Sequence, residues 1–274
     1  MYERYWKLDR AAFRGTHDSN GYYPSRTHQG ALVKLRYLIE HRLGAGLFLG
    51  DHGLGKTYLT HVLEAELPEH FGPVARLVFP QMTPVELLAY LAAKLGAESP
   101  RFEESLRTDR VLQLLETRLA QLASEGRHPI LMIDEAQVLT PQHFQILHLL
   151  LNLPAEANAH FSLLLIGDPD LLPKVQRVGA LDDRIGVRTT LRNLTLEETE
   201  GYLAARLEYA GRGGESIFTE DAIRTLWEIS QGVPRRINQL CDLSLLVGYA
   251  DSLTSISHLE IEAAAEEFAT VSVE

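Results

Sequence analysis

The chain of 274 residues is long enough for one large domain or two modest ones, and 45% of its residues are hydrophobic while 23% are charged. This composition is typical of a packed globular protein and excludes disordered and fibrous classes. The 26 basic and 37 acidic residues leave a formal net charge of -11, which disfavours non-specific binding to nucleic-acid backbones and anionic lipid.

Helical and strand patterns alternate along the first part of the sequence, from about residue 28 to residue 191. The helical periodicity predicts helices over residues 28–42, 56–67 and 108–125. A further helix is expected after Thr83, because Glu86 lies at the spacing of a capping box. Strands are expected over residues 46–50 and 74–79, and continuous apolar runs predict two more over residues 130–133 and 162–166. Such runs, rather than alternating ones, indicate a parallel sheet covered by helices on both faces.

The remainder of the chain shows only helical periodicity. We expect helices over residues 196–210, 220–231, 235–250 and 258–268, with glycine-containing loops at 211–214 and 232–234. The sequence therefore predicts an α/β domain of residues 1–193, followed by a smaller α-helical domain of residues 194–274.

A glycine-rich string lies between the first expected strand and the helix that follows it. The string Gly50-Asp-His-Gly-Leu-Gly-Lys-Thr57 matches the phosphate-loop pattern G-x-x-x-x-G-K-[ST] at every position. Its glycines allow a tight turn whose N–H groups point at phosphate oxygens, beside the positive end of a helix. Lys56 is then expected to reach the β- and γ-phosphates of ATP, and the Thr57 hydroxyl to ligate Mg²⁺.

Two acidic residues follow the expected strand of residues 130–133. Asp134 is placed to hold Mg²⁺ through its water shell, and Glu135 to orient and polarise the attacking water. An acidic pair at a strand end is by itself also typical of a solvated turn. Together with the phosphate loop upstream, the pair predicts a P-loop ATPase that binds and hydrolyses Mg-ATP.

A third polar strand end is Asp168, which follows the expected strand of residues 162–166. In an open parallel sheet the carboxyl ends of the strands converge on the ligand crevice. Asp168 is therefore a candidate contact for the γ-phosphate or for the water. The alternative is that Asp168 caps a helix over residues 169–176, because Asp before Pro is a common helix start.

Cysteine, histidine and hydropathy patterns disfavour a disulfide, a zinc site, a signal peptide and a membrane span. The single Cys241 lies in an apolar run, so we expect a buried thiol and no disulfide within one chain. The histidines show no spacing that suits zinc. The N-terminal residues lack the apolar core of a signal peptide, and no apolar run approaches the roughly 18 residues of a membrane span. We expect a cytoplasmic protein without a membrane span.

These strings, with others downstream, resemble the ExeA/GspA branch of the AAA+ ATPases, which is related to the ATPase subunits of Tn7- and Mu-like transposition. The resemblance covers nearly the whole chain. Besides the phosphate loop it includes Met1-Tyr2, Pro24-Ser-Arg-Thr-His28, Ile133-Asp-Glu-Ala-Gln137, Gly167-Asp-Pro-Asp-Leu171, Asp183-Arg-Ile185, Tyr202-Leu-Ala-Ala-Arg-Leu207, Ala210-Gly211, Phe218-Thr-Glu-Asp-Ala222 and Gly232-Val-Pro-Arg-Arg-Ile-Asn-Gln-Leu-Cys241. The last string is the most specific after the phosphate loop.

The resemblance implies a parallel five-stranded core with a helical lid, nucleotide held between them, and a second subunit that closes the site. It implies that Arg184, or alternatively Arg188, acts across the subunit boundary. Arg235 would read the γ-phosphate from the lid, with Arg236 as the neighbouring candidate. The nucleotide-binding residues expected are Gly50, Asp51, His52, Gly53, Leu54, Gly55, Lys56, Thr57, Tyr58 and Arg235.

Plainer interpretations of these residues stay open. If Arg235 and Arg236 do not contact nucleotide, they cover a solvated helix start. If Arg184 does not act across a subunit boundary, it pairs with Asp182 or Asp183 at the surface. Members of the branch often carry glutamine where Asp168 stands and threonine where Tyr58 stands. They also often have a longer chain, with a membrane segment and a peptidoglycan-binding domain.

The favoured hypothesis is an oligomeric ATPase whose nucleotide state controls assembly with a protein partner. The alternative is an ATP-dependent switch on duplex DNA, like the transposition ATPases. The basic residues available for that role do not form one run: Lys34, Arg36, Arg42, Arg101, Arg107 and Arg110. A third class, a nucleotide-gated scaffold with negligible turnover, is disfavoured by Glu135. The sequence does not distinguish a ring from a filament.

Overall fold

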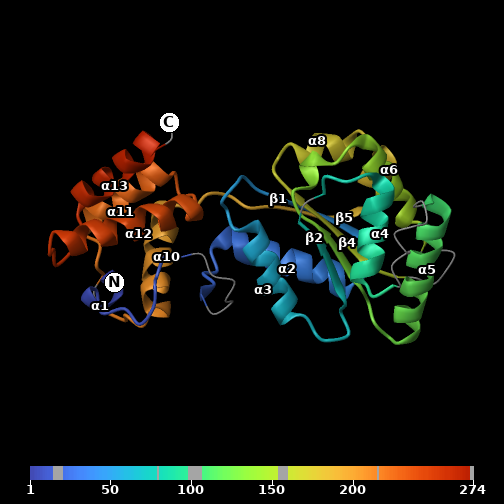
Figure 1. Cartoon of the computed structure of the whole chain (residues 1–274), viewed down its shortest axis with the longest axis horizontal. Coiled ribbons are helices and arrows are strands. Elements are labelled where there is room, and N and C mark those ends of the chain that lie inside the picture. The colour runs from blue at the N-terminus through green and yellow to red at the C-terminus, as the bar shows by residue number, and fades with distance from the viewer. Residues whose placement is uncertain (15–20, 79, 98–106, 154–159, 215, 272–274) are drawn as a thin grey trace. The chain divides into compact units, whose positions relative to one another are not determined.

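The computed structural model describes residues 1–14, 21–78, 80–97, 107–153, 160–214 and 216–271. The chain forms two compact units (Figure 1). The α/β unit comprises Thr27–His52 and Leu59–Leu191, and the helical unit comprises Met1–Arg26, Gly53–Tyr58 and Arg192–Glu274. Among the helices of the described residues, none is long and apolar enough to cross a membrane.

The α/β unit is built on a five-stranded sheet. Its strands are β1 (Ala45–Leu49), β2 (Val74–Leu77), β3 (Ile130–Ile133), β4 (Ser162–Gly167) and β5 (Ile185–Thr190). The strand order is β2-β3-β4-β1-β5, and every neighbouring pair is parallel. The predicted five-stranded parallel sheet is therefore confirmed, and the carboxyl ends of all five strands lie at one edge.

Helices cover both faces of this sheet. They are α2 (Arg26–Glu40), α3 (Lys56–Glu66), α4 (Pro84–Lys94), α5 (Thr108–Ser124), α6 (Pro141–Leu150), α8 (Leu171–Gln176) and α9 (Gly179–Asp182). Figure 1 shows α2 and α3 on one side of the sheet and α4 and α6 on the other. Every residue of β1, β3 and β4 is buried, because both faces of these strands are covered.

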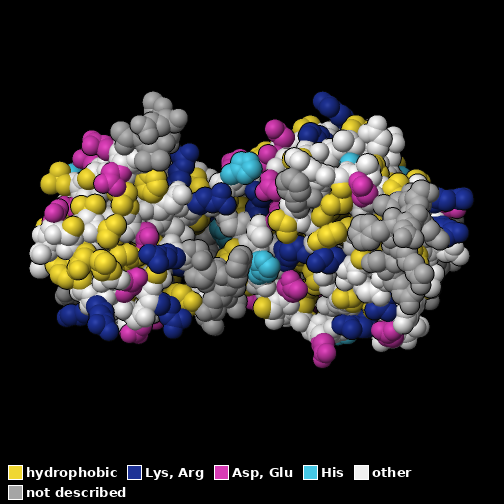
Figure 2. All heavy atoms as spheres, viewed as in Figure 1, with side chains coloured by type: hydrophobic (Ala, Val, Ile, Leu, Met, Phe, Trp, Pro, Cys, Tyr) yellow, Lys and Arg dark blue, Asp and Glu magenta, His cyan; other side chains and the backbone are white. Residues whose placement is uncertain are grey.

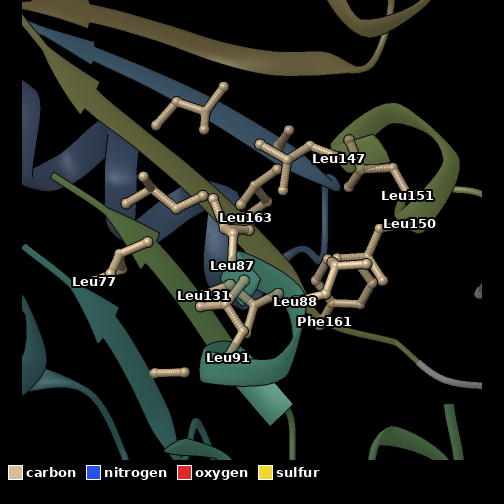
Figure 3. Packing of buried hydrophobic residues seen from close by; sticks show 14 of the residues in the cluster. Leu77, Leu87, Leu88, Leu91, Leu131, Leu147, Leu150, Leu151, Phe161 and Leu163 are labelled. Carbon is tan, nitrogen blue, oxygen red and sulfur yellow. The ribbon is translucent and has the colours of Figure 1, made fainter. Parts of the chain in front are cut away.

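The main apolar core lies between the sheet and α4, α5 and α6. Leu87 and Leu91 of α4 pack around Leu131 and Leu163 of the sheet (Figure 3). These residues are fully buried. The continuously apolar runs of the sequence therefore supply the sheet side of one extended core.

Side-chain caps define where two helices of this unit begin. Glu86 N donates to Thr83 Oγ1 at 3.3 Å and Thr83 N donates to Glu86 Oε2 at 2.7 Å, which confirms the predicted capping box of α4. At the start of α6, Thr140 N donates to His143 Nδ1 at 3.2 Å, while His143 Nε2 lies 2.8 Å from the carbonyl oxygen of Met82. Both ring nitrogens of His143 therefore have structural partners.

The helical unit contains α10 (Leu196–Tyr209), α11 (Glu220–Ser230), α12 (Pro234–Ala250) and α13 (His258–Val271), together with the short α1 (Tyr2–Tyr5). These bounds lie close to the predicted ones. Cys241 is buried in the core of this unit, as predicted, and burial raises the pKa of its thiol well above the usual value.

The N-terminal segment is part of the helical unit. Trp6 is buried, and its Nε1 donates to the carbonyl oxygen of Leu245 at 2.9 Å. The buried Arg206 of α10 donates through Nε to the carbonyl oxygen of Ala12 at 2.7 Å. The sequence patterns do not anticipate this packing, because a helix of 4 residues and the irregular chain after it carry no periodic signal.

The buried His128 makes the stability of the α/β unit depend on pH. Its side chain is only 1% exposed, its Nε2 lies 2.9 Å from Ser162 Oγ, and burial lowers its pKa from 6.5 to about 4. Between these two pH values the unfolded chain binds a proton that the folded protein does not bind. Stability therefore falls as the pH decreases through this window.

We expect His128 to reduce the free energy of unfolding by ~1–2 kcal/mol between pH 7.5 and pH 5.5. The measurement is urea unfolding of the parent protein and of His128→Gln at both pH values. The parent should lose more stability on acidification than the variant, because glutamine does not titrate. Identical pH dependence of the two proteins would contradict the assignment.

Candidate nucleotide site

The phosphate loop connects the carboxyl end of β1 to the first residue of α3. Gly50 N donates to the carbonyl oxygen of Gly167 at 3.1 Å, which ties the start of the loop to the end of β4. Gly53 and Gly55 have φ angles of 83° and 89°, a left-handed conformation that favours glycine. Lys56 begins α3 and is buried. The loop therefore has the glycine-dependent turn and the helix start that phosphate binding needs.

Arg235 lies beside this loop, at the second residue of α12. Its backbone N donates to the carbonyl oxygen of Gly53 at 3.2 Å, and both residues belong to the helical unit. A Cβ at residue 53 would lie 2.9 Å from Arg235 Cβ. Glycine at this position therefore permits both the turn and the approach of α12.

The acidic pair continues β3 at the carboxyl edge of the sheet. Asp134 is buried, its N donates to the carbonyl oxygen of Leu77 at 2.8 Å, and its Oδ1 accepts from Glu135 N at 3.0 Å. Glu135 has a left-handed φ of 52° and precedes the 3-10 turn Ala136–Val138. A non-glycine residue in this conformation is strained and is held by its surroundings.

Asp168 follows β4 at the same edge. Its Oδ1 accepts from Asp170 N at 3.0 Å, in the turn that leads into α8, so the side chain supports a helix start. Its Oδ2 lies 4.0 Å from Nε2 of His52 in the phosphate loop. The N-cap of α8 is Asp170 and the helix begins at Leu171, so Asp168 supports the preceding turn rather than capping a helix over residues 169–176. Its contact with the γ-phosphate or the water stays a prediction.

Gln137 is a site residue to which the sequence analysis gave no role. Its Nε2 donates to Glu135 Oε2 at 2.7 Å, and its Oε1 accepts from Asp168 N at 3.3 Å. It belongs to the resemblance string that contains Asp134 and Glu135. No pattern in one sequence could reveal that it also contacts the end of β4.

The two candidate arginines lie near the start and middle of β5. Arg184 immediately precedes β5, and its carbonyl oxygen accepts from the N of Ala45, the first residue of β1, at 3.3 Å. Its Nη2 donates to Asn152 Oδ1 at 2.7 Å. Arg188 Nη2 instead donates to Asp182 Oδ1, at 2.7 Å. Among the described residues, Asp182 therefore pairs with Arg188 rather than with Arg184.

The residues at this edge fit a magnesium–nucleotide complex. In the described part of the chain, no group of three or more His, Cys, Asp or Glu side chains is arranged to hold a metal alone. Mg²⁺ usually keeps several waters and binds through one or two protein groups together with substrate phosphates. The two groups that the sequence assigns to Mg²⁺, the Asp134 carboxylate and the Thr57 hydroxyl, are a ligand set of this kind.

Comparison with known proteins defines the class of this chain. The family model of the AAA domain matches residues 39–175, and the chain belongs to that family. General secretion pathway protein A from Aeromonas hydrophila is 29% identical over 269 residues, which is 97% of this chain and 48% of that protein. The predicted resemblance to the ExeA/GspA branch of AAA+ ATPases is thereby confirmed. The chain spans about half the length of this curated relative.

Solved structures share the fold. The chain is similar to Cdc6p from Pyrobaculum aerophilum, with a TM-score of 0.75, 18% identity, and coverage of 95% of this chain and 71% of that chain. The ORC2 protein of Aeropyrum pernix, solved as ADPNP-ADP complexes, gives a TM-score of 0.67 at 20% identity over 94% and 71% of the two chains. The RuvB branch migration motor of Thermotoga maritima gives 0.57 at 17% identity, over 87% and 68%. These identities support the fold alone.

Proposed function

We propose that this chain binds Mg-ATP at the phosphate loop and hydrolyses it with Glu135. The observation that carries the proposal is the arrangement of three strand ends at one edge of the sheet. The phosphate loop leaves β1, Asp168 leaves the neighbouring β4, and the acidic pair leaves β3 beyond it. The ADPNP-ADP complexes of the ORC2 protein support nucleotide binding in this fold.

Each residue at this edge has a defined chemical task in the proposal. Backbone N–H groups of the loop and the Lys56 ammonium bind the phosphate oxygens. Thr57 and Asp134 hold Mg²⁺, which neutralises phosphate charge when it is bound. Glu135 orients the attacking water and accepts its proton. Arg235, whose backbone N donates to the carbonyl oxygen of Gly53 in the phosphate loop, contacts the γ-phosphate.

The test of the proposal is the loss of nucleotide binding in Lys56→Ala. This change removes the charge-assisted hydrogen bonds of an ammonium to phosphate, and we expect ATP affinity to fall about 10- to 100-fold. Binding is measured by the fluorescence of a labelled ATP analogue, with Lys34→Ala on the exposed surface of α2 as the control. Equal affinities for all three proteins would refute the assignment of the loop.

We further propose that ATP controls assembly of the chain with itself and with a protein partner in the cytoplasm. Arg184 supplies the structural support, because it lies beside the amino end of β1 while the phosphate loop leaves the carboxyl end. An arginine in this position can complete the site of a neighbouring subunit rather than its own. The number of subunits follows from native mass spectrometry with and without ATP.

Duplex DNA is the alternative partner. It is favoured by structural neighbours that were solved with DNA, the ORC1 protein of Aeropyrum pernix and Drosophila ORC. The net charge of -11 opposes it. On the face shown in Figure 2, basic and acidic side chains are interspersed rather than gathered by sign. Binding to duplex DNA at low salt with a non-hydrolysable ATP analogue, weakening steeply as salt rises, would establish this alternative; its absence would favour a protein partner.

A further inference from the structure

The side chain of Gln137 bridges the acidic pair after β3 and the end of β4. Its Nε2 donates to Glu135 Oε2 at 2.7 Å, and its Oε1 accepts from Asp168 N at 3.3 Å. Gln137 is buried. An amide is suited to this position, because it offers a donor to the carboxylate on one side and an acceptor to the backbone N–H on the other.

The orientation of this amide is fixed by its partners. Asp168 N is a donor and must meet the amide oxygen, so the NH₂ group faces the Glu135 carboxylate. The opposite orientation would place oxygen against oxygen at Glu135 and N–H against N–H at Asp168. The bridge therefore places an N–H donor against the carboxylate at residue 135.

The surroundings of Gln137 restrict its movement. Its backbone lies in the 3-10 turn Ala136–Val138, and the carbonyl oxygen of Gln137 accepts from Lys174 Nζ of α8. A Cβ at residue 167 would lie 2.6 Å from Gln137 Oε1, so the glycine there leaves room for the amide. Residues from β4 and α8 thus hold the group that contacts Glu135.

We propose that Gln137 is a positioning residue for hydrolysis. It holds the Glu135 carboxylate at a fixed position relative to the end of β4. This inference rests on the proposed ATPase function. The hydrogen bond occupies Oε2 of Glu135 and directs the remaining lone pairs of the carboxylate to the water. Because Gly167 also accepts from Gly50 N of the phosphate loop at 3.1 Å, a shift of the β4 end is transmitted to both loop and carboxylate.

Gln137→Met is the first test, because methionine keeps the length of the side chain and removes both hydrogen bonds. We expect kcat for ATP to fall about 10- to 100-fold, as for the loss of a hydrogen bond to a charged group. The dissociation constant of a non-hydrolysable ATP analogue should stay within about twofold, because Gln137 contacts Glu135 and β4 rather than the loop. The matched control is Gln121→Met, on the exposed face of α5, which should leave kcat unchanged.

Gln137→Glu gives a readout that a purely structural role would not produce. A carboxylate keeps an acceptor for Asp168 N but offers no donor to Glu135, so kcat should fall while the dissociation constant of the non-hydrolysable analogue stays within about twofold. Gly167→Ala should also lower kcat, because its Cβ would displace the Gln137 amide. Unchanged kcat in Gln137→Met, or in Gln137→Glu, would overturn the proposal.

Failure of this inference is distinguishable from failure of the proposed function. Glu135→Gln is measured alone and combined with Gln137→Met. If Gln137 acts through Glu135, the second change should lower kcat no further once Glu135 is absent. Additive losses would overturn the positioning role while leaving ATP hydrolysis intact, whereas full activity of Glu135→Gln would contradict the function itself.

Discussion

Glu135→Gln is expected to retain ATP binding and to lower the rate of hydrolysis by about 10²- to 10⁴-fold, the range for loss of a positioned proton acceptor. Glutamine keeps the length and volume of the side chain. Its amide oxygen can still accept from Gln137 Nε2, which lies 2.7 Å from Glu135 Oε2 in the parent protein. The side chain therefore stays in place, while an amide neither polarises the water nor takes its proton.

The measurement combines single-turnover hydrolysis with equilibrium binding of a labelled ATP analogue. Glu262→Gln is the matched control, because this glutamate of α13 is exposed and lies in the helical unit. It should match the parent protein in both assays. Hydrolysis by Glu135→Gln at the parental rate would show that another group activates the water.

The sequence predicts the central part of the sheet well, because burial on both faces leaves a continuous apolar run. Such runs mark β1, β3 and β4, whose residues are all buried. The edge strand β5 lacks this signal. It alternates half-buried and exposed positions from Ile185 to Arg188, since successive side chains point to opposite faces of the sheet and one face of this strand is more exposed than the other. A fifth strand was therefore expected from the resemblance and not from the residues themselves.

The candidate site was likewise predicted only in part, because its local motifs are visible in the sequence and its long-range contacts are not. The phosphate loop and the acidic pair are local strings, and each carries its chemistry within a few residues. The role of Gln137 depends on its contact with Asp168, which is 31 positions further along the chain. Likewise, the approach of Arg235 to Gly53 depends on how α12 packs. One sequence contains no local signal for contacts of this kind.

The position of Arg184 supports the proposal that it serves a neighbouring subunit. Its carbonyl oxygen accepts from Ala45 N at the start of β1, whereas the phosphate loop follows Leu49 at the other end. A strand of 5 residues separates the two ends by roughly 15 Å at about 3.3 Å per residue. Its guanidinium is exposed and is held by the Asn152 side chain. Arg188 lies further along the edge strand, opposite Leu47, and is paired with Asp182.

Arg184→Ala is expected to lower ATPase activity about 10³- to 10⁵-fold, the effect of arginine fingers where they are known. The guanidinium would neutralise charge that develops on the transferred phosphoryl group of the adjacent subunit. Because an arginine that acts from a neighbouring subunit does not contribute to the site of its own chain, ATP binding to the isolated chain should be unchanged. Arg188→Ala, which removes the neighbouring arginine within β5, is the matched comparison.

The deciding experiment mixes two inactive proteins, Arg184→Ala and Lys56→Ala. An interface that joins the intact Arg184 of one to the intact phosphate loop of the other is active, and random mixing in equal amounts should restore about a quarter of the interfaces. The specific activity of the parent protein should also rise with concentration. Arg184 does not act between subunits if native mass spectrometry shows mixed oligomers that remain inactive, or if the dilute monomer hydrolyses ATP at the full rate.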